Sequence, residues 1–171
     1  PYQSVLIDLT QSLEQIRKGF RGNWRRSLQK AQKLEEATIE KGAGLHLFAP
    51  LISLYEEMKE RKQFTDFQDI AEYKKIQSQL PEPLKMTVAI CKLHDTPTAG
   101  AVWSSVGSRG CLHFMASGKK ALEIGSTYRL TWELICDLKN QGCEFMDFGG
   151  YDTINNPSGW TIKRGVGGQQ I

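Results

Sequence analysis

The spacing of apolar residues predicts a long helix near the end of the chain, over residues 127–142. Its apolar positions recur at steps of three and four, with charged residues between them: Tyr128, Trp132, Ile135 and Leu138. Gly142 supplies a stop signal. Residues 144–148 form a short bulky run closed by two glycines, which is typical of a strand that leads into a turn. The pattern therefore predicts a unit of helix, strand and glycine turn.

Three further apolar runs precede this unit and are separated by turn residues. They cover residues 86–93, 98–106 and 111–116. Both connections are short enough for hairpins, so the runs predict an antiparallel meander. The helix that follows is long enough to carry the chain back across the sheet. The strand at residues 144–148 is therefore expected to pair in parallel with its neighbour.

The first half of the chain mixes short apolar runs with helical patterns. Residues 5–9 predict either an edge strand or the end of a strand whose neighbours lie upstream. Thr10 is a candidate cap for a helix over residues 11–20, and Asn23 for a second helix. Further along, we expect a strand and two amphipathic helices, at residues 37–40, 47–58 and 67–80.

Composition favours one domain, because the chain has 171 residues of which 40% are hydrophobic and 24% charged. It has no apolar run of the roughly 18 residues that cross a membrane, and its start lacks the features of a signal peptide. The missing initiator Met predicts that the chain is part of a longer protein. Four cysteines without Cys-x-x-Cys spacing lie in apolar runs, which indicates reduced thiols, a cytoplasmic setting and no metal site.

Positive charge is concentrated at the beginning of the chain, although the net charge is only +3. Four basic residues follow Asn23 and lie apart from the apolar face of the predicted helix: Arg25, Arg26, Lys30 and Lys33. Such a group is either a solvated helix surface or a binding face for an anion. In the second case Coulomb attraction and counterion release would make the affinity fall with salt.

Two glycine-rich motifs lie near the end of the chain: Asp147-Phe148-Gly149-Gly150 and Ile162-Lys163-Arg164-Gly165-Val166-Gly167-Gly168. They resemble the C-terminal motifs of the Fem family, the aminoacyltransferases that build peptidoglycan cross-bridges, and of related acyltransferases of the GNAT superfamily. The family pattern is Asp-Phe-Gly-Gly, a loop, then aromatic-Lys-Lys/Arg-Gly-Phe-Gly-Gly. Here Ile162 and Val166 stand at the two aromatic positions. The basic segment 25–33 is also similar to a Fem helix, which favours its anion-binding interpretation.

The resemblance implies a GNAT-like α/β fold with a mixed sheet, in agreement with the predicted order of meander, helix and parallel strand. In that fold the strands on either side of the long helix part and leave a cleft, whose lips here would be residues 116–119 and 147–151. Ordinary acetyltransferases bind coenzyme A with a Gln/Arg-x-x-Gly-x-Gly/Ala loop, and residues 119–126 do not match it. No cofactor is therefore expected.

By the same resemblance, the acyl donor would be the ester of an aminoacyl-tRNA. The acceptor would be the stem peptide of a nucleotide- or lipid-linked peptidoglycan precursor, with peripheral membrane contact. The resemblance also implies that this chain is the C-terminal half of a longer protein, with a further GNAT-like domain on its N-terminal side.

Lys163 is the leading candidate for a catalytic residue. By the resemblance it would hold the donor's terminal phosphate or the tetrahedral oxyanion, with Arg164 beside it. The alternative is a basic pair on a surface loop, because turn residues and glycines surround it over residues 155–168. Asp147 would either orient the acceptor amine or stabilise a turn.

The other candidates come from the same two motifs and the loop between them. Tyr151 and Trp160 would line an acceptor groove or simply pack, while Gly149, Gly150 and Gly165 would serve backbone geometry. Two other functions remain open: an acyl-CoA-dependent N-acyltransferase of the GNAT superfamily, and a non-catalytic module that binds RNA or a partner protein.

Overall fold

Seven strands form one mixed sheet in the computed structural model, which describes residues 3–63, 69–151, 153 and 157–171. The strands lie in the order β2-β3-β4-β5-β6-β1-β7. β5 and β6 pair in parallel, and the other neighbouring strands pair antiparallel. The strands are β1 (Ser4–Asp8), β2 (Ala37–Gly42), β3 (Thr87–Leu93), β4 (Thr96–Val106), β5 (Arg109–Ser117), β6 (Phe145–Gly150) and β7 (Gln169–Gln170).

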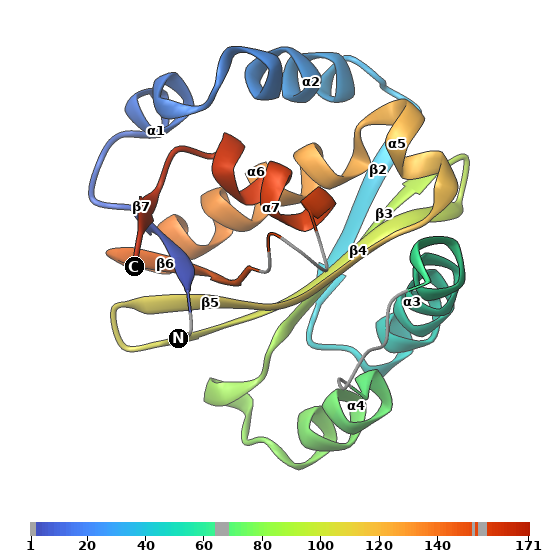
Figure 1. The fold of residues 1–171 in the computed structure, drawn as a ribbon. Coiled ribbons are helices and arrows are strands. Elements are labelled where there is room, and N and C mark those ends of the chain that lie inside the picture. Colours follow the sequence, from blue (N-terminus) through green and yellow to red (C-terminus); the bar gives the residue numbers. More distant parts are fainter. Residues whose placement is uncertain (1–2, 64–68, 152, 154–156) are drawn as a thin grey trace.

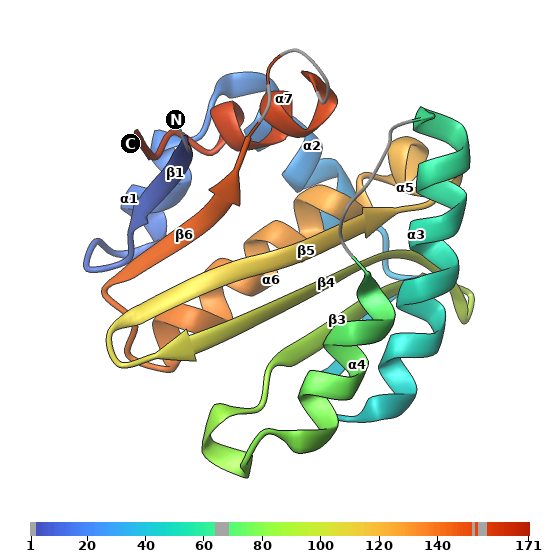
Figure 2. The same ribbon diagram turned by 60° about the horizontal axis from the view of Figure 1, so that its bottom comes forward.

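Helices cover both faces of this sheet (Figures 1 and 2). α1, α2, α6 and α7 lie over one face, and α3 and α4 over the other. The short helix α5 joins β5 to α6. The helices are α1 (Leu13–Gly19), α2 (Gly22–Gln32), α3 (Phe48–Lys62), α4 (Ile70–Gln79), α5 (Lys119–Ile124), α6 (Ser126–Asn140) and α7 (Pro157–Gly165), with 3-10 turns η1 (Leu45–Leu47) and η2 (Glu82–Leu84).

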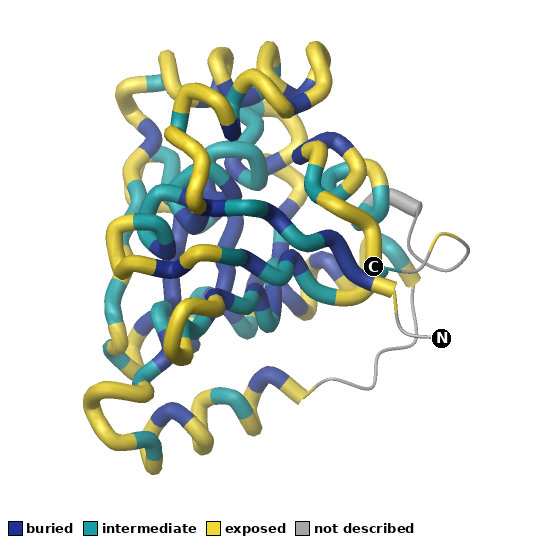
Figure 3. The backbone as a smooth tube through the Cα atoms, turned by 90° about the vertical axis from the view of Figure 1, so that its left-hand side faces the viewer, coloured by how far each residue is buried: buried dark blue, intermediate teal, exposed yellow. Residues whose placement is uncertain are grey.

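Two buried clusters join these layers. The larger packs α1, α2 and α6 on the sheet and includes Trp24, Trp103 and Leu134. The smaller packs α3 and α4 on the opposite face and includes Phe48 and Leu51. Figure 3 shows buried residues along the strands and exposed residues on the outer sides of the helices. Because both faces of β3 and β4 are covered, their apolar runs are continuous instead of alternating.

The predicted meander, long helix and parallel strand are confirmed. β3, β4 and β5 form the antiparallel meander, and α6 carries the chain to β6, which pairs parallel with β5. The buried stripe of α6 is turned slightly from the predicted one and consists of Leu130, Leu134, Ile135 and Leu138. Tyr128 and Trp132 lie at its border, where their rings contact Trp24 and Phe20 at centroid distances of 5.1 and 5.8 Å.

The predicted strand at residues 5–9 is β1, but it is not an edge strand. It lies between β6 and β7, and β7 comes from the last residues of the chain. Ser4 and Ile171 exchange backbone hydrogen bonds of 2.9 and 3.0 Å, which extends this pairing by one position. The neighbours of β1 therefore come from downstream in the sequence.

The predicted helix caps were misplaced by about two residues. Ser12, and not Thr10, caps α1: its hydroxyl accepts from the Gln15 N–H while the Gln15 side chain accepts from the Ser12 N–H. α2 begins after Arg21, and the Asn23 side chain accepts from the N–H of Trp24 inside the helix. α4 begins at Ile70, and the earlier part of its predicted range lies outside the described residues.

The loop predicted over residues 155–168 is wrong for most of its length. The chain forms α7 up to Gly165, and β7 follows at Gln169. Trp160, Ile162 and Val166 pack against the larger core cluster. Packing therefore stabilises a helix that the local sequence disfavours. No helix of the described residues is both long and apolar enough to span a bilayer.

Candidate functional site

β5 and β6 pair over three positions. Beyond these positions the two strands part (Figure 2). Their parallel register runs from Arg109↔Phe145 to Cys111↔Asp147. Beyond this last pair, β5 continues to Ser117 and β6 to Gly150 without pairing to each other. The parting of the two strands next to the long helix, expected from the resemblance, is therefore present.

The end of β6 is shaped by a carboxylate and a glycine turn. The β1–β6 register shifts between Ser4 and Leu6, so β6 carries an extra residue there. Gly149 has a φ of +76°, which L side chains rarely adopt. The Asp147 carboxylate accepts a 2.8 Å hydrogen bond from the Gly149 N–H and another from the Ser4 hydroxyl. Asp147 thus stabilises the turn, one of the two roles expected of it.

Ser4 is a site residue that sequence reasoning missed. It is fully buried, and its hydroxyl holds Asp147 from the neighbouring strand. A serine at the start of a short apolar run carries no signal of this role, because the contact joins residues that are 143 positions apart.

Lys163 reaches the glycine turn from α7. Its Nζ donates to the carbonyl oxygens of Gly149 and Gly150 at 3.0 and 2.5 Å, and lies 5.7 Å from the centroid of the Phe148 ring. Burial lowers the pKa of Lys163 to about 8, although the nearby Asp147 carboxylate acts in the opposite direction. The amine is therefore held next to the parted strands and changes charge close to neutral pH. It does not belong to a basic pair on a free loop.

The other predicted residues around Lys163 fall into two groups. Tyr151 and Trp160 stack on each other, with ring centroids 4.1 Å apart and planes inclined by 28°. Both are half-buried, so each combines packing with some exposure. Arg164 is exposed. The structure therefore brings Lys163, Asp147 and the glycine turn together, while Arg164 faces solvent.

Gly165 lies against the ring of Trp24. A Cβ at this position would approach the Trp24 Cδ1 atom to 2.3 Å, far inside any tolerated contact. The Gly165 carbonyl also accepts a 2.9 Å hydrogen bond from the Arg21 N–H. Gly165 therefore serves the close approach of α7 to α2, and through it the placement of Lys163.

Two charged residues of α3 lie at the end of β5 and were not predicted. Arg61 donates to the Ser117 carbonyl oxygen at 2.8 Å. The Glu57 carboxylate accepts a 2.7 Å hydrogen bond from the N–H of Lys119, the first residue of α5. The i, i+4 spacing of Glu57 and Arg61 on one helix was the available sequence signal, but it does not reveal which strand end they approach.

The family model for the acetyltransferase (GNAT) domain matches residues 18–156, which include the meander, α6 and β6. The chain belongs to the GNAT acetyltransferase domain family. The expected GNAT-like mixed α/β fold is confirmed. No curated protein matched the sequence.

Solved structures with a similar fold include an acetyltransferase of comparable length and longer chains. FemX superposes with a TM-score of 0.86 at 14% identity, covering 99% of this chain and 59% of FemX. The C-terminal domain of a putative lysylphosphatidylglycerol synthetase from Agrobacterium fabrum gives 0.66 at 16% identity, covering 96% and 51%. An aminoglycoside acetyltransferase from an uncultured soil metagenomic sample gives 0.59 at 19% identity, covering 77% and 87%. The chain thus spans little more than half the length of the first two proteins.

The segment that replaces the coenzyme A loop is poorly suited to a diphosphate because its first N–H group is already bonded to a carboxylate. Residues 119–124 form α5, whose first N–H already donates to Glu57, so a negative charge lies where an anion would bind. At the start of α6, Ser126 is buried and its hydroxyl lies 2.7 Å from that of Thr98. This arrangement differs from the open helix N-terminus that favours phosphate binding. Within the described residues, no three His, Cys, Asp or Glu side chains gather as a metal site.

The basic residues of α2 lie on the outside of this GNAT domain. Arg25, Arg26, Lys30 and Lys33 are exposed, whereas Trp24, Leu28 and Ala31 face the core. Arg25 donates to the Lys18 carbonyl oxygen at 2.7 Å, which fixes its position next to α1. The predicted cationic face is therefore formed as the periodicity indicates, and it is separate from the glycine turn held by Lys163.

Proposed function

We propose that this GNAT domain is part of an aminoacyltransferase that moves an amino acid from aminoacyl-tRNA to an amine on the stem peptide of a peptidoglycan precursor. The observation that carries the proposal is the half-buried Lys163, which is held at a glycine turn beside the parted strands. The two motifs that form this arrangement are those that resemble the Fem family, and FemX shares the fold over 99% of the chain.

In this reaction the acceptor nitrogen attacks the carbonyl carbon of the donor ester. A tetrahedral oxyanion forms, the bond between the carbonyl carbon and the ribose oxygen breaks, and the proton lost by nitrogen ends on the departing ribose oxygen. Protonated Lys163 stabilises either the oxyanion or a donor phosphate, because a cation in a partly dry setting interacts more strongly than in water. Asp147 and Ser4 contribute by fixing the turn that receives the Lys163 amine.

The exposed residues Arg25, Arg26, Lys30 and Lys33 would attract the tRNA backbone. A donor of this kind implies a cytoplasmic reaction. A lipid-linked acceptor would bring the domain to the membrane surface as a peripheral protein. The acceptor site would depend in part on a further GNAT-like domain of the longer protein.

The test uses the full-length protein with charged tRNA and a nucleotide-linked or lipid-linked precursor, followed by gel separation of the product. Transfer that is lost in Lys163→Ala and restored in Lys163→Arg supports the proposal. Unchanged turnover in Lys163→Ala would favour a module that only binds RNA or a partner protein.

An acyl-CoA-dependent N-acyltransferase is the second candidate, and the family match itself favours it. The position of Glu57 at the first turn of α5 is the observation against it. Calorimetry with coenzyme A separates the two functions, because tight binding of coenzyme A would exclude an aminoacyl-tRNA donor as the physiological one.

A further inference from the structure

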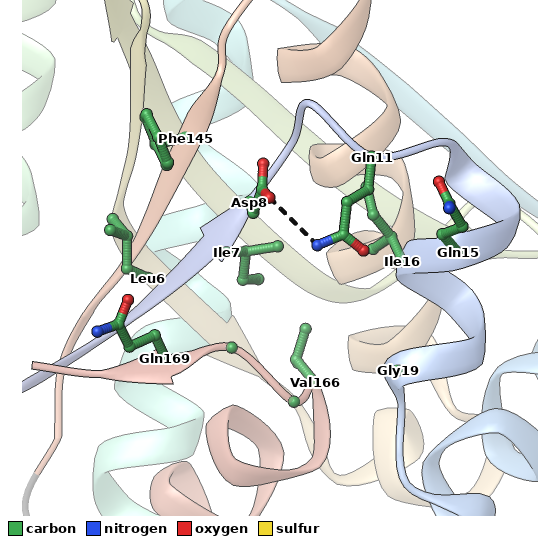
Figure 4. A pocket seen from close by; sticks show the side chains of 12 residues that line it. Leu6, Ile7, Asp8, Gln11, Gln15, Ile16, Gly19, Phe145, Val166 and Gln169 are labelled. Carbon is green, nitrogen blue, oxygen red and sulfur yellow. Dashed lines mark hydrogen bonds between the residues drawn. The ribbon is translucent and has the colours of Figure 1, made fainter.

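A pocket of about 230 Å³ opens at the end of the β1–β6 pair where Asp8 and Phe145 lie (Figure 4). β1, the start of β6, α1 and the turn before β7 form its walls. Asp8 and Phe145 mark this end of the ladder, whereas Ser4 and Gly150 mark the other. Ser4 and Asp8 are four steps apart along an extended strand, or about 13 Å. The pocket is therefore distinct from the site held by Lys163.

The outer edge of β1 is free where it enters this pocket. β7 pairs only with Val5 and Leu6, because the chain turns away at Gly167 and Gly168. Ser4 exchanges hydrogen bonds with Ile171 on the β7 side, and Leu9 donates to Glu144 on the β6 side. Backbone groups alternate along a strand, so those of Asp8 point outward, past the end of β7. Within the described residues, no backbone group pairs with Asp8 on that side.

The side chains around this free edge suit a polar ligand without negative charge. Asp8 is the charged residue of the lining, and the amides of Gln11, Gln15 and Gln169 accompany it. Asp8 accepts from the Thr10 hydroxyl and N–H at 2.6 and 2.9 Å and from Gln11 at 3.2 Å. These hydrogen bonds, the Thr10 hydroxyl first, lower the pKa of Asp8, so it stays ionised at neutral pH.

The size of the pocket narrows the choice of ligand. Its volume is below the roughly 300 Å³ at which pockets for small organic ligands begin, so a nucleotide does not fit. The negative charge of a phosphate would also be repelled by the Asp8 carboxylate. The floor is apolar, with Ile7, Ile16 and Val166. A short stretch of backbone with small side chains matches this space, because a free strand edge offers both a donor and an acceptor to a peptide.

We propose that this pocket binds the amino-terminal end of an extended peptide, which pairs with the free edge of β1 and places its ammonium group near Asp8. The peptide lies in line with β7 and continues the sheet beyond it. The glutamine amides supply further hydrogen bonds at the rim, and the apolar floor holds the first side chain. This binding is independent of the acyl transfer proposed for the Lys163 site.

Substitution of one glycine can block the pocket, and substitution of a second glycine is the control. Gly19 lines the pocket, and a Cβ there would meet no other atom within 4 Å, so a Gly19→Leu side chain starts from open space beside the pocket. Gly22 has equally open surroundings but lies outside the pocket lining. Gly22→Leu is therefore the matched control. Asp8→Asn removes the charge and keeps the shape, and circular dichroism verifies that all variants are folded.

The probes are tetra-alanine with a free amino terminus and its N-acetylated form, titrated into the ¹⁵N-labelled full chain by NMR. We expect millimolar binding of free tetra-alanine, with slower hydrogen exchange at the Asp8 amide. Gly19→Leu should weaken binding by about tenfold or more, and Gly22→Leu by less than about twofold. N-acetylation should weaken binding to the wild type by about fivefold but make little difference in Asp8→Asn.

Three results would each overturn the proposal. The first is no response to tetra-alanine at the highest soluble concentration. The second is binding that leaves the exchange of the Asp8 amide unchanged, or that shifts only residues around Lys163. The third is a Gly19→Leu protein that binds as tightly as the wild type. Loss of acyl transfer with intact tetra-alanine binding would instead contradict only the function proposed for the Lys163 site.

Discussion

The two ends of the β1–β6 ladder carry different charged groups: Lys163 together with Asp147 at one end, and Asp8 at the other. At the end formed by Ser4 and Gly150, α7 brings the Lys163 amine onto two carbonyl oxygens. At the end formed by Asp8 and Phe145, the charged lining residue is Asp8, and the edge of β1 is unpaired. The strands also differ, because β6 carries an extra residue and the Gly149 turn at the first end and pairs regularly with β1 at the second. The segment from α7 to β7 adds to the difference, because it covers one end and turns away from the other.

This comparison shows that one short segment, from α7 to β7, can give the two ends of the β1–β6 pair different surroundings. Lys163 and Val166 lie on the same segment, the first at the glycine turn and the second in the wall of the pocket. A change in Lys163 should affect one end alone, whereas a displacement of α7 should affect both.

The largest effect is expected from Lys163→Ala. Loss of a donor that stabilises an oxyanion lowers turnover by about a hundredfold or more. Single-turnover transfer from charged tRNA measures it in the full-length protein, and Lys163→Arg should recover much of the rate. Lys18→Ala removes an exposed lysine that pairs with Glu14 at 2.7 Å and is the control for loss of charge. Equal rates for Lys163→Ala and Lys18→Ala would remove Lys163 from the mechanism.

Gly165→Ala should disturb both ends. Its Cβ would lie 2.3 Å from the Trp24 Cδ1 atom, so α7 must shift and the free energy of unfolding should fall by about 1–3 kcal/mol. Urea denaturation measures this loss. Gly22→Ala, in open surroundings on α2, should change the free energy of unfolding by less than about 1 kcal/mol. A Gly165→Ala protein as stable as the wild type would show that α7 is not held by this contact.

The pH dependence should separate the two ends. Lys163 is protonated below its pKa of about 8 and loses its charge as the pH rises through that value. Donor RNA affinity that depends on Lys163 should therefore decline above about pH 8, by up to roughly tenfold per pH unit. Lys163→Arg should remove the decline, since arginine stays charged.

Asp147→Asn sharpens this test, because the Asp147 carboxylate raises the pKa of Lys163 against the effect of burial. Its removal should move the decline to lower pH. Fluorescence anisotropy of labelled aminoacyl-tRNA measures the decline in affinity and its shift in Asp147→Asn. The measurements run between pH 6.5 and about 9.5, a window around the Lys163 pKa. A pH profile that is identical in wild type and Lys163→Arg would contradict the assignment.

The smallest effect is expected from the double variant Arg26→Ala and Lys30→Ala. Both side chains are exposed on α2, away from either end of the ladder. Their loss should weaken tRNA binding a few-fold and reduce the slope of log affinity against log salt by about 1–2. Lys74→Ala with Lys75→Ala, on α4 across the sheet, is the matched control. A salt slope that equals the wild-type value would assign the α2 charges to solvation alone.

Much of the fold could be predicted because its signals are local. The meander, the long helix and the parallel strand follow from the hydrophobic periodicity and from the lengths of the apolar runs. The cationic face of α2 lies where the spacing of its basic residues places it. Asp147, Gly149 and Lys163 could also be chosen as site candidates, since the family resemblance rests on short sequence motifs. The helix α7, which brings Lys163 into contact with the turn, could not be predicted.

Sequence alone determined the strands β1 to β6 and the residues that carry charge, since both are properties of short segments, whereas β7 was not predicted. Tertiary structure decided that α7 is a helix, because Trp160, Ile162 and Val166 need the core and Gly165 needs the ring of Trp24. It also decided that β1 lies inside the sheet. The lowered pKa of Lys163 depends on burial and on a carboxylate from another element, which no local pattern encodes.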